Sequence, residues 1–551
     1  MHNVKRIAAA LIALVMLVLC GCSGGSGEIP DDTSAPTGAS ANPSATPAPA
    51  QPKYGGTLKL SIGPYDTINP LRTSNEDLRL YLCSLVCEPL VDIGSDMQIL
   101  PHILTSWTFD ETYTVWELTM ARDVTFHSGA AAEAADVKNL IDNLVGFGGN
   151  YGINVANVAG CSVKDKYTVQ VILKEPDALF INKLCIPFIG WKTLVSDNAK
   201  VLDATGIFKA TEFGDKHILL EKNTLYRDKS KLTYYNTVDI SVFETEHEKL
   251  SSDFDICVLQ GGTVGASLLG RGTSVYYYGG TGYDYIAINC TPTYLLGSDV
   301  DEETGEKNYI ALRNPFYDKR LRQALNLVTS RENAVDRAAS EHGQIALLPL
   351  YSGTVYRKQQ ESDYSYNTDR ARILLKDIGY TSTDDGWFMA GEELVVTAIC
   401  PKRNFRMLTV MREAVDGLEK IGVKVDLLEL SDEEYLERLN NKEYMIASVE
   451  IELGVWQDCG PVFGTTGELN YSFFSDVRID GYITQTSLHS DPAVVSAAYA
   501  KIEEIILEEC PIVGLFIPDN AVITSSRLKG VKEENLRPWA PLADIGEWWI
   551  D

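Results

Sequence analysis

The chain has 551 residues and a formal net charge of −28, with 45% hydrophobic and 23% charged residues. Beyond an unusual amino-terminal stretch, about 500 residues remain, which is enough for several domains with a large core. Such an excess of carboxylates repels nucleic acid and anionic headgroups, so the composition excludes nucleic acid as a partner.

The first 22 residues have the pattern of a bacterial lipoprotein leader. Lys5 and Arg6 precede an apolar run over 7–19, which suits a secretory signal and is too short to span a bilayer. The segment LCGC resembles a lipobox, in which small residues precede a cysteine that becomes diacylated. We expect a signal peptide over 1–21 and a lipid anchor (palmitate or a similar acyl chain) on Cys22, because two acyl chains give stable anchoring. An ordinary secretion signal with incidental cysteines is the alternative.

Residues 22–53 are predicted to form a disordered tether. After Cys22 this stretch is rich in Pro, Ala, Gly, Ser and Thr, and its one large aliphatic residue is Ile29. It therefore cannot bury enough apolar surface to offset the entropy lost on ordering.

Strand and helix patterns alternate from Tyr54 to the end of the chain. GGTLKLSIG alternates as a strand, and apolar stripes predict helices over 137–145 and 321–328. Start and stop signals predict further helices from Asp369 to Gly379, after the Ser431/Glu434 capping box, and from Asp491-Pro492 to just before Pro511. GVKVDLLEL, IVGLFI and YYYGGTGYDYIAIN are β-prone. This alternation predicts an α/β fold.

Nine cysteines remain beyond Cys20 and Cys22, an odd number that leaves at least one thiol free or bound to another molecule. Most stand beside apolar residues, so buried thiols are the favoured interpretation, and a few disulfides stay open. The nine are Cys83, Cys87, Cys161, Cys185, Cys257, Cys290, Cys400, Cys459 and Cys510.

Motifs typical of enzymes are missing from the sequence. The chain has no GxSxG elbow, no HExxH, no phosphate-binding GxxxxGK[ST] loop and no GxGxxG after a strand. Carboxylates flank His247 in ETEHEKL, but a charge run of this kind is typical of a solvated face. We therefore expect a protein that is not an enzyme and has neither a metal site nor a cofactor.

Several separated stretches of the chain have the order of landmarks of a single family. They begin with YGGTLKLSIGPYDTINPL, continue with CEPLVDI, LPHILTSWTF and YTVWELTMARDVTFHSGAAAEAADV, and end with TGIFKATEF, YIAIN, NPFYDKRLRQAL, ARILLKDIGY and IGVKVDLLEL. In this order they resemble the extracellular solute-binding proteins of family 5, whose members are peptide, dipeptide and nickel receptors of ATP-binding-cassette (ABC) importers. The first stretch resembles the family's opening strand and loop, and the second group resembles its most recognisable block, although FHSG replaces the usual FHDG. The resemblance covers Tyr54 to Val531.

The resemblance implies an α/β fold of two lobes, of the periplasmic-binding-protein type (class II, cluster C). Lobe 1 would comprise 54–94, 205–314 and 511–551, with an extra domain over 95–204, and lobe 2 would comprise 315–510. The chain would cross between the lobes near Asn314-Pro315 and near Pro511, where proline fixes φ and excludes helix.

The family pattern also implies a ligand site between the lobes. In lobe 1 it indicates Thr73, Ser74 and Asn75, for which an ordinary surface turn is an equally good interpretation, and then Gln260, Gly261 and Tyr285. In lobe 2, peptide binders place a tryptophan and then an aspartate that pairs with the ligand's α-ammonium. Here YMIASVEIELGVWQDCGPVF offers Glu450, Glu452, Trp456 and Asp458, none of them at the aspartate's usual spacing.

These patterns together predict a receptor on the extracellular face of the cell membrane. It would be lipid-anchored and monomeric, capture a peptide-like solute and deliver it to ABC permease subunits, with no nucleic-acid partner. Three alternatives stay open: a binder of another solute such as a nickel chelate or an oligosaccharide, an extracellular hydrolase, and a sensor.

Overall fold

A long mixed sheet runs through the described part of the chain, which in this computed structural model comprises residues 52–94, 98–195, 201–231, 233–259, 261, 272–300, 307–350, 364–454 and 458–551. The strand order is β10-β11-β12-β1-β13-β25-β15-β24-β22-β23, with β14 and β18 also paired to β25. The predictions on Cys22, Gln260 and Trp456 lie outside the described residues and stay predictions.

The first half of the sheet forms the frame of lobe 1. It contains β1 (Thr57–Ile62), β10 (Phe208–Phe213), β11 (His217–Lys222), β12 (Thr237–Val242), β13 (Ile256–Leu259) and β14 (Thr273–Gly279). In β1 the predicted face is buried: Leu58, Leu60 and Ile62 are at most 1% exposed. These side chains share a core with α2 (Glu76–Leu85) and with buried residues of the carboxyl-terminal segment such as Trp548.

Lobe 2 is built on the other half of the sheet. It contains β15 (Gly282–Ile288), β18 (Gly343–Ile345), β22 (Val395–Pro401), β23 (Lys424–Leu430) and β24 (Ile446–Glu452). α10 (Phe405–Lys420) connects β22 to the parallel strand β23, and α11 (Asp432–Asn441) connects β23 to β24. These crossovers confirm the α/β fold predicted from the alternating pattern.

Helix boundaries follow the predicted caps closely. Ser431 accepts a hydrogen bond from the Glu434 amide at the start of α11, and Asp491 caps α14 (Pro492–Glu509), which ends at Cys510. The predicted stripes form α3 (Ala134–Phe147) and α7 (Lys319–Val328). Among the helices predicted from caps, α9 (Thr368–Ile378) begins two residues earlier than predicted. Its N-cap is Asn367 rather than Asp369, since an asparagine side chain caps as well as an aspartate.

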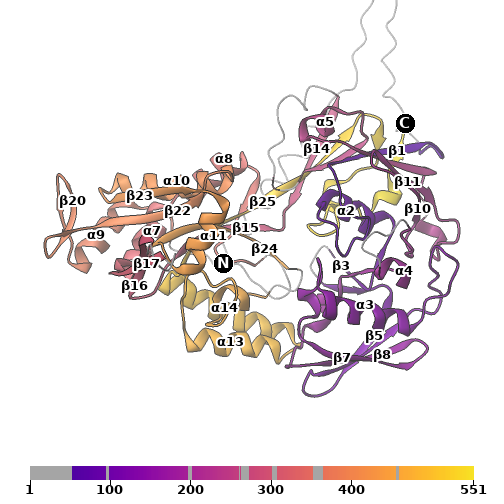
Figure 1. The fold of residues 1–551 in the computed structure, drawn as a ribbon, viewed down its shortest axis with the longest axis horizontal. Coiled ribbons are helices and arrows are strands. Elements are labelled where there is room, and N and C mark those ends of the chain that lie inside the picture. Colours follow the sequence, from indigo (N-terminus) through magenta and orange to yellow (C-terminus); the bar gives the residue numbers. More distant parts are fainter. Residues whose placement is uncertain are drawn as a thin grey trace, which may run out of the picture. The chain divides into compact units, whose positions relative to one another are not determined.

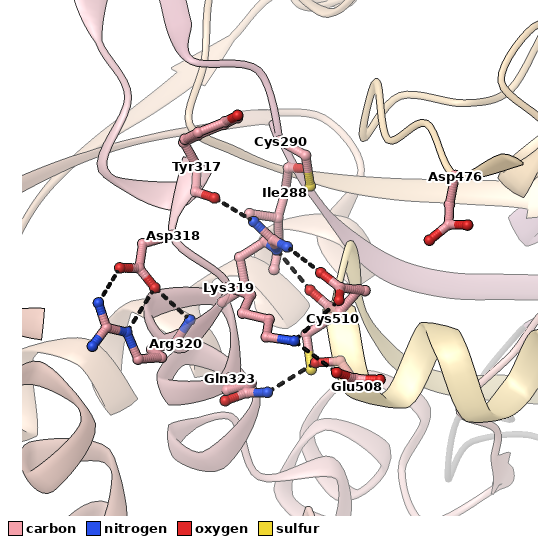
Figure 2. A network of polar contacts seen from close by, with 12 residues as sticks. Ile288, Cys290, Tyr317, Asp318, Lys319, Arg320, Gln323, Asp476, Glu508 and Cys510 are labelled. Atoms are coloured by element: carbon pink, nitrogen blue, oxygen red, sulfur yellow. Dashed lines mark hydrogen bonds and ion pairs between the residues drawn. The ribbon is translucent and has the colours of Figure 1, made fainter. Parts of the chain in front are cut away.

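A network of polar contacts fastens the end of α14 to α7 inside lobe 2 (Figure 2). Lys319 Nζ lies 2.7 Å from Glu508 Oε1 and 3.1 Å from Glu509 Oε1. Arg322 Nε donates to the Glu509 carbonyl at 2.7 Å, and Gln323 Nε2 donates to the Glu508 carbonyl at 2.8 Å. Carbonyls at a helix end have no partner within the helix, so these donors satisfy them just before β25 begins.

The segment expected as an extra domain is built on a separate small sheet. The strand order is β5 (Leu104–Phe109), β6 (Val115–Met120), β8 (Thr168–Leu173) and β7 (Val158–Asp165). Its buried side chains, including Trp116 and Leu140, join the same core as β1 and α2. The segment therefore has its own sheet and shares its core with lobe 1.

The two crossings between the lobes differ in position from those expected at Asn314-Pro315 and Pro511. Ile286 and Ile288 of β15 already pack in the lobe 2 core with Leu321, so the first crossing falls at 279–282. The second falls within β25 (Ile512–Ser525), whose first half packs in lobe 2 and whose second half pairs with β13 and β14 (Figure 1). The first crossing lies in the short link between β14 and β15, and the second lies within β25, which contains Pro518, so neither falls at the prolines expected to mark it.

The nine described cysteines are free thiols, and five are buried, in agreement with the favoured interpretation. None of the described helices is long and apolar enough to cross a membrane.

Candidate functional site

A cavity of about 790 Å³ lies where the two lobes meet. Its lobe 1 wall is α2, whose residues at intervals of three and four face the cavity: Glu76, Arg79, Leu80, Cys83, Ser84 and, just beyond the helix, Cys87. The opposite helix face, with Leu78, Tyr81 and Leu82, is buried in the core. The 3.6-residue period of the helix thus presents one polar face to the cavity and one apolar face to the core.

The predicted loop before α2 positions this wall and does not line the cavity. Asn75 is the N-cap of α2: its Oδ1 accepts from the Leu78 amide at 2.8 Å, and its Nδ2 donates to the Gly63 and Pro64 carbonyls. Thr73 is buried, and its hydroxyl and the Ser74 amide both donate to Asp66 Oδ1. These three residues therefore hold the start of the helix, one turn away from Arg79.

The lobe 2 wall begins at the end of β24. It includes Ile451, Glu452, Leu453 and Gly454, followed by Asp458 and Val462. Burial raises the pKa of Glu452, and the nearby Glu76 carboxylate raises it further, while a hydrogen bond from Thr281 and the charge of Arg79 lower it. Glu452 of lobe 2 thus lies within electrostatic reach of Glu76 and Arg79 of lobe 1.

Contacts between the lobes border this cavity. The Leu453 amide donates to the Thr281 carbonyl at 2.7 Å, beside the first crossing. Trp539, from the carboxyl-terminal segment of lobe 1, lines the cavity and donates from Nε1 to the Leu453 carbonyl at 3.3 Å. The Ala178 amide donates to the Ser487 carbonyl at 2.8 Å, which joins the extra segment of lobe 1 to α13 (Val477–Ser487). Because both lobes supply cavity walls, a bound solute would contact both.

Glu450 and Gly261 meet at a second contact between the lobes, made by Arg406 of α10. Arg406 Nε lies 3.0 Å from Asp284 Oδ2, its Nη1 donates to the Gly261 carbonyl at 3.0 Å, and its Nη2 pairs with Glu450. The Gly261 amide in turn donates to Asn520 Oδ1 at 2.6 Å. Glu450 and Gly261 are therefore engaged with this arginine, and only Asn520 of this group lines the cavity.

Tyr285 belongs to the lobe 2 core. It is 1% exposed and stacks on Tyr283 with ring centroids 5.5 Å apart. Of the ten residues that the sequence indicated for ligand binding, Glu452 and Asp458 line the cavity, and Asp458 Oδ1 also accepts from the Gly460 amide at 2.8 Å.

The cavity has an acidic lining. Among its described lining residues, eight carboxylate side chains accompany two side chains of Lys or Arg, namely Arg79 and Lys231. The carboxylates are Glu76, Glu88, Asp92, Glu452, Asp458, Glu468, Asp544 and Glu547. Within the ranges that the structure covers, no group of three or more His, Cys, Asp or Glu is arranged to hold a metal ion.

Several of the residues that line the cavity were not predicted from the sequence. Arg79 could have been found from the helical spacing that follows Asn75, because Glu76, Arg79 and Cys83 fall on one face. Glu88, His102 and Trp539 carry no such signal, since they come from three segments that meet only in the folded chain.

Comparisons with known proteins agree with this architecture. The profile described as "Bacterial extracellular solute-binding proteins, family 5 Middle" matches residues 98–467. The oligopeptide-binding protein AppA of Bacillus subtilis is 22% identical over 99% of both chains. The structure of AppA from Bacillus subtilis in complex with a nonapeptide is similar with a TM-score of 0.64, at 20% identity, over 91% of this chain and 100% of that one.

A second solved structure, NikA from Brucella suis in complex with Fe(III)-EDTA, is similar with a TM-score of 0.72, at 16% identity, over 90% of this chain and 100% of that one. The relatives are binding proteins rather than enzymes, and their structures have the two-lobe α/β fold. Because the family match covers well over half of the chain, this protein belongs to the family 5 bacterial extracellular solute-binding proteins, which serve ABC importers.

Proposed function

We propose that this protein is a lipid-anchored receptor that captures a peptide-like solute between its lobes outside the cell and delivers it to an ABC permease, without catalysing a reaction. The observation that carries the proposal is the cavity lined by both lobes. Its volume of about 790 Å³ is within the range of roughly 300–1,000 Å³ that is typical of small-ligand sites.

The charges of the cavity walls favour a zwitterionic chain. Glu452 and Asp458 from lobe 2 can accept hydrogen bonds from an ammonium group, and Arg79 from lobe 1 can pair with a carboxylate. Trp539 adds a flat apolar surface for side chains, and Trp456, from the stretch just before Asp458, is proposed to do the same. AppA of Bacillus subtilis, a relative over the full length, is named for oligopeptide binding, which supports a peptide over a metal chelate.

Ligand-driven closure provides the physical basis of transport. A solute that contacts both walls stabilises the arrangement in which the lobes meet, because an open form lacks half of those contacts. The closed form is then what a permease can recognise. We expect a monomer to be sufficient, since the described walls come from one chain.

Anchoring at Cys22 would keep the receptor near its permease. Two acyl chains give stable attachment to a membrane, and a tether of this length and composition has a typical reach of about 30 Å. The receptor would then sample a small volume next to the membrane rather than diffuse away.

Isothermal titration on the mature protein tests the proposal. Tri-, tetra- and penta-alanine are titrated together with their amino-terminally acetylated forms, and small molecules that copurify are identified by mass spectrometry. We expect binding of the free peptides and a loss of about 10- to 100-fold in affinity on acetylation, because the charge-assisted hydrogen bonds to the ammonium are lost.

A Glu452→Gln variant should weaken binding of the free peptides and should leave the acetylated forms unaffected. Glu504→Gln is the matched control, because Glu504 is an exposed residue of α14 paired only with the nearby Lys501. A response to a nickel chelate or an oligosaccharide with none to any peptide would contradict the peptide assignment. Turnover of a peptide by the purified protein would contradict a purely binding role.

A further inference from the structure

Glu88 forms a buried polar cluster at the lobe 1 end of the cavity wall. It lies in β2 (Glu88–Pro89), directly after α2, and is 3% exposed. Its Oε1 lies 3.3 Å from the Tyr226 hydroxyl, 3.1 Å from Arg227 Nε and 3.5 Å from His102 Nε2. Tyr226 and Arg227 thus donate to a single oxygen of this carboxylate, and His102 lies beside the same oxygen.

The other oxygen of Glu88 has no hydrogen-bond partner among the described residues. Oε2 is enclosed by protein, and no group in the described ranges donates to it. Buried polar atoms in folded proteins nearly always have a partner, because an unsatisfied one loses its hydration without compensation. Since Glu88 is also a lining residue, a donor delivered from the cavity is the simplest way to satisfy Oε2.

His102 is a described lining side chain that lies beside this carboxylate. Its ring lines the cavity, and its contact with Glu88 is the longest of the three. Burial lowers the pKa of His102 below its usual value although the Glu88 carboxylate raises it, so the environment favours the neutral ring beside Glu88. Arg227 remains as the partner of Oε1 when the ring moves.

The charges near Glu88 determine which donor is favoured. Arg227 compensates the charge of Glu88, and Lys231 is a second cationic residue, which lines the cavity. Asp92, Asp544 and Glu547 also line the cavity, and acidic residues predominate in its described lining as a whole. A cationic group that enters the cavity therefore gains more binding free energy than a neutral hydrogen-bond donor does.

We propose that the Glu88 carboxylate receives the ammonium or guanidinium group of a lysine- or arginine-like side chain of the ligand, so that this receptor favours cationic peptides. This inference rests on the proposed function, because it names the class of peptide that the same cavity selects. It assigns Glu88 as a residue that determines specificity and His102 as the side chain that yields to the ligand.

Titrations on the unaltered mature chain give the first test. Tri- and tetra-alanine are compared with peptides in which each alanine in turn is replaced by lysine, norleucine or glutamate. We expect lysine to bind about 10- to 100-fold more tightly than norleucine at one position, and glutamate to bind most weakly there. Norleucine matches the lysine stem without its charge, so the difference isolates the ammonium group.

Variants then locate the effect. Glu88→Gln places an amide where the free oxygen was, so the lysine preference should disappear while norleucine affinity is unchanged. His102→Ala opens access to Glu88 and should preserve or increase the lysine preference, which provides a second measurement if Glu88→Gln does not fold. Glu504→Gln, on an exposed face of α14, is the control.

The outcomes separate this inference from the proposed function. Equal affinity for lysine and norleucine peptides would overturn the cationic preference, and the proposed function as a peptide receptor would still stand. A lysine preference that survives Glu88→Gln or is lost in His102→Ala would overturn the assignment to Glu88. Binding of no peptide at all, whatever its charge, would instead overturn the proposed function.

Discussion

Replacement of Arg406 by methionine tests how the lobes are held together beside the crossing strands. Arg406 pairs with the buried Asp284, with Glu450 and with the Gly261 carbonyl across the lobes. Methionine keeps much of the stem and removes all three interactions. Asp284, which is 1% exposed, then loses its only ion-pair partner among the described residues.

The pH dependence of this perturbation follows from Asp284. Burial raises the pKa of Asp284 from 3.8 to about 7, and Glu450 adds to the rise, whereas Arg406 opposes it. The folded protein therefore holds a proton that the unfolded chain releases. The stabilisation from this group is fully present below pH 3.8 and is lost as the pH rises to about 7, a change of about 4 kcal/mol in the free energy of unfolding.

Without Arg406 the pKa of Asp284 rises further. Up to pH 7 the carboxyl is mainly protonated in both proteins, so the substitution costs about 1–3 kcal/mol through the lost hydrogen bonds. Above pH 7 the wild type loses progressively less stability through this group, while the variant, whose carboxyl stays protonated to higher pH, loses up to about 1.4 kcal/mol for each pH unit. The cost of Arg406→Met should therefore be larger at pH 8 than at pH 7, by up to about 1 kcal/mol.

Urea unfolding, followed by tryptophan fluorescence between pH 5 and 8, measures both effects. Asp284→Asn is the control, because it cannot titrate and should remove the extra cost of Arg406→Met at pH 8. Stability curves of the wild type and the Arg406→Met variant that stay parallel from pH 5 to 8 would refute the reasoning. So would an unchanged pH dependence in the Arg406→Met/Asp284→Asn double variant.

Three further substitutions test separate features of the chain. Cys22→Ser should release the protein to the medium or leave an unprocessed precursor, and unchanged retention in the membrane fraction would count against a lipid anchor. Asn75→Ala should lower the free energy of unfolding by about 1 kcal/mol through the lost N-cap of α2, and further through the lost Nδ2 hydrogen bonds to the Gly63 and Pro64 carbonyls. Asn75→Asp keeps the cap and loses only the Nδ2 bonds, so equal losses in both variants would argue against capping. Gly280→Ala would place a Cβ atom 2.1 Å from the Pro518 carbonyl oxygen, so the melting temperature should fall by several degrees. An unchanged melting temperature would show that the chain at the first crossing can move away from β25 without loss of stability.

Local sequence signals were sufficient for most elements and for the family. The Ser431 and Asp491 caps, the stripe that became α7 and the alternation of β1 were all predicted, because caps and periodicity act within a few residues. The crossing points were not predicted, because β25 continues as one strand through its change of lobe, and the polar residues Asp519 and Asn520 at its middle do not end the strand. Nothing in one strand's sequence distinguishes which core each half will join.

The residues of the candidate site were likewise predicted only in part. The sequence alone indicated that the chain belongs to a binding family and that acidic residues lie in and just after β24, and two of these, Glu452 and Asp458, line the cavity. Only the tertiary structure decided that Glu450 faces Arg406 and that Glu88, His102 and Trp539 meet at one cavity. The physical reason is distance along the chain: these segments lie beyond the reach of helix or strand periodicity and come into contact only after the cores form, so no local pattern records their encounter.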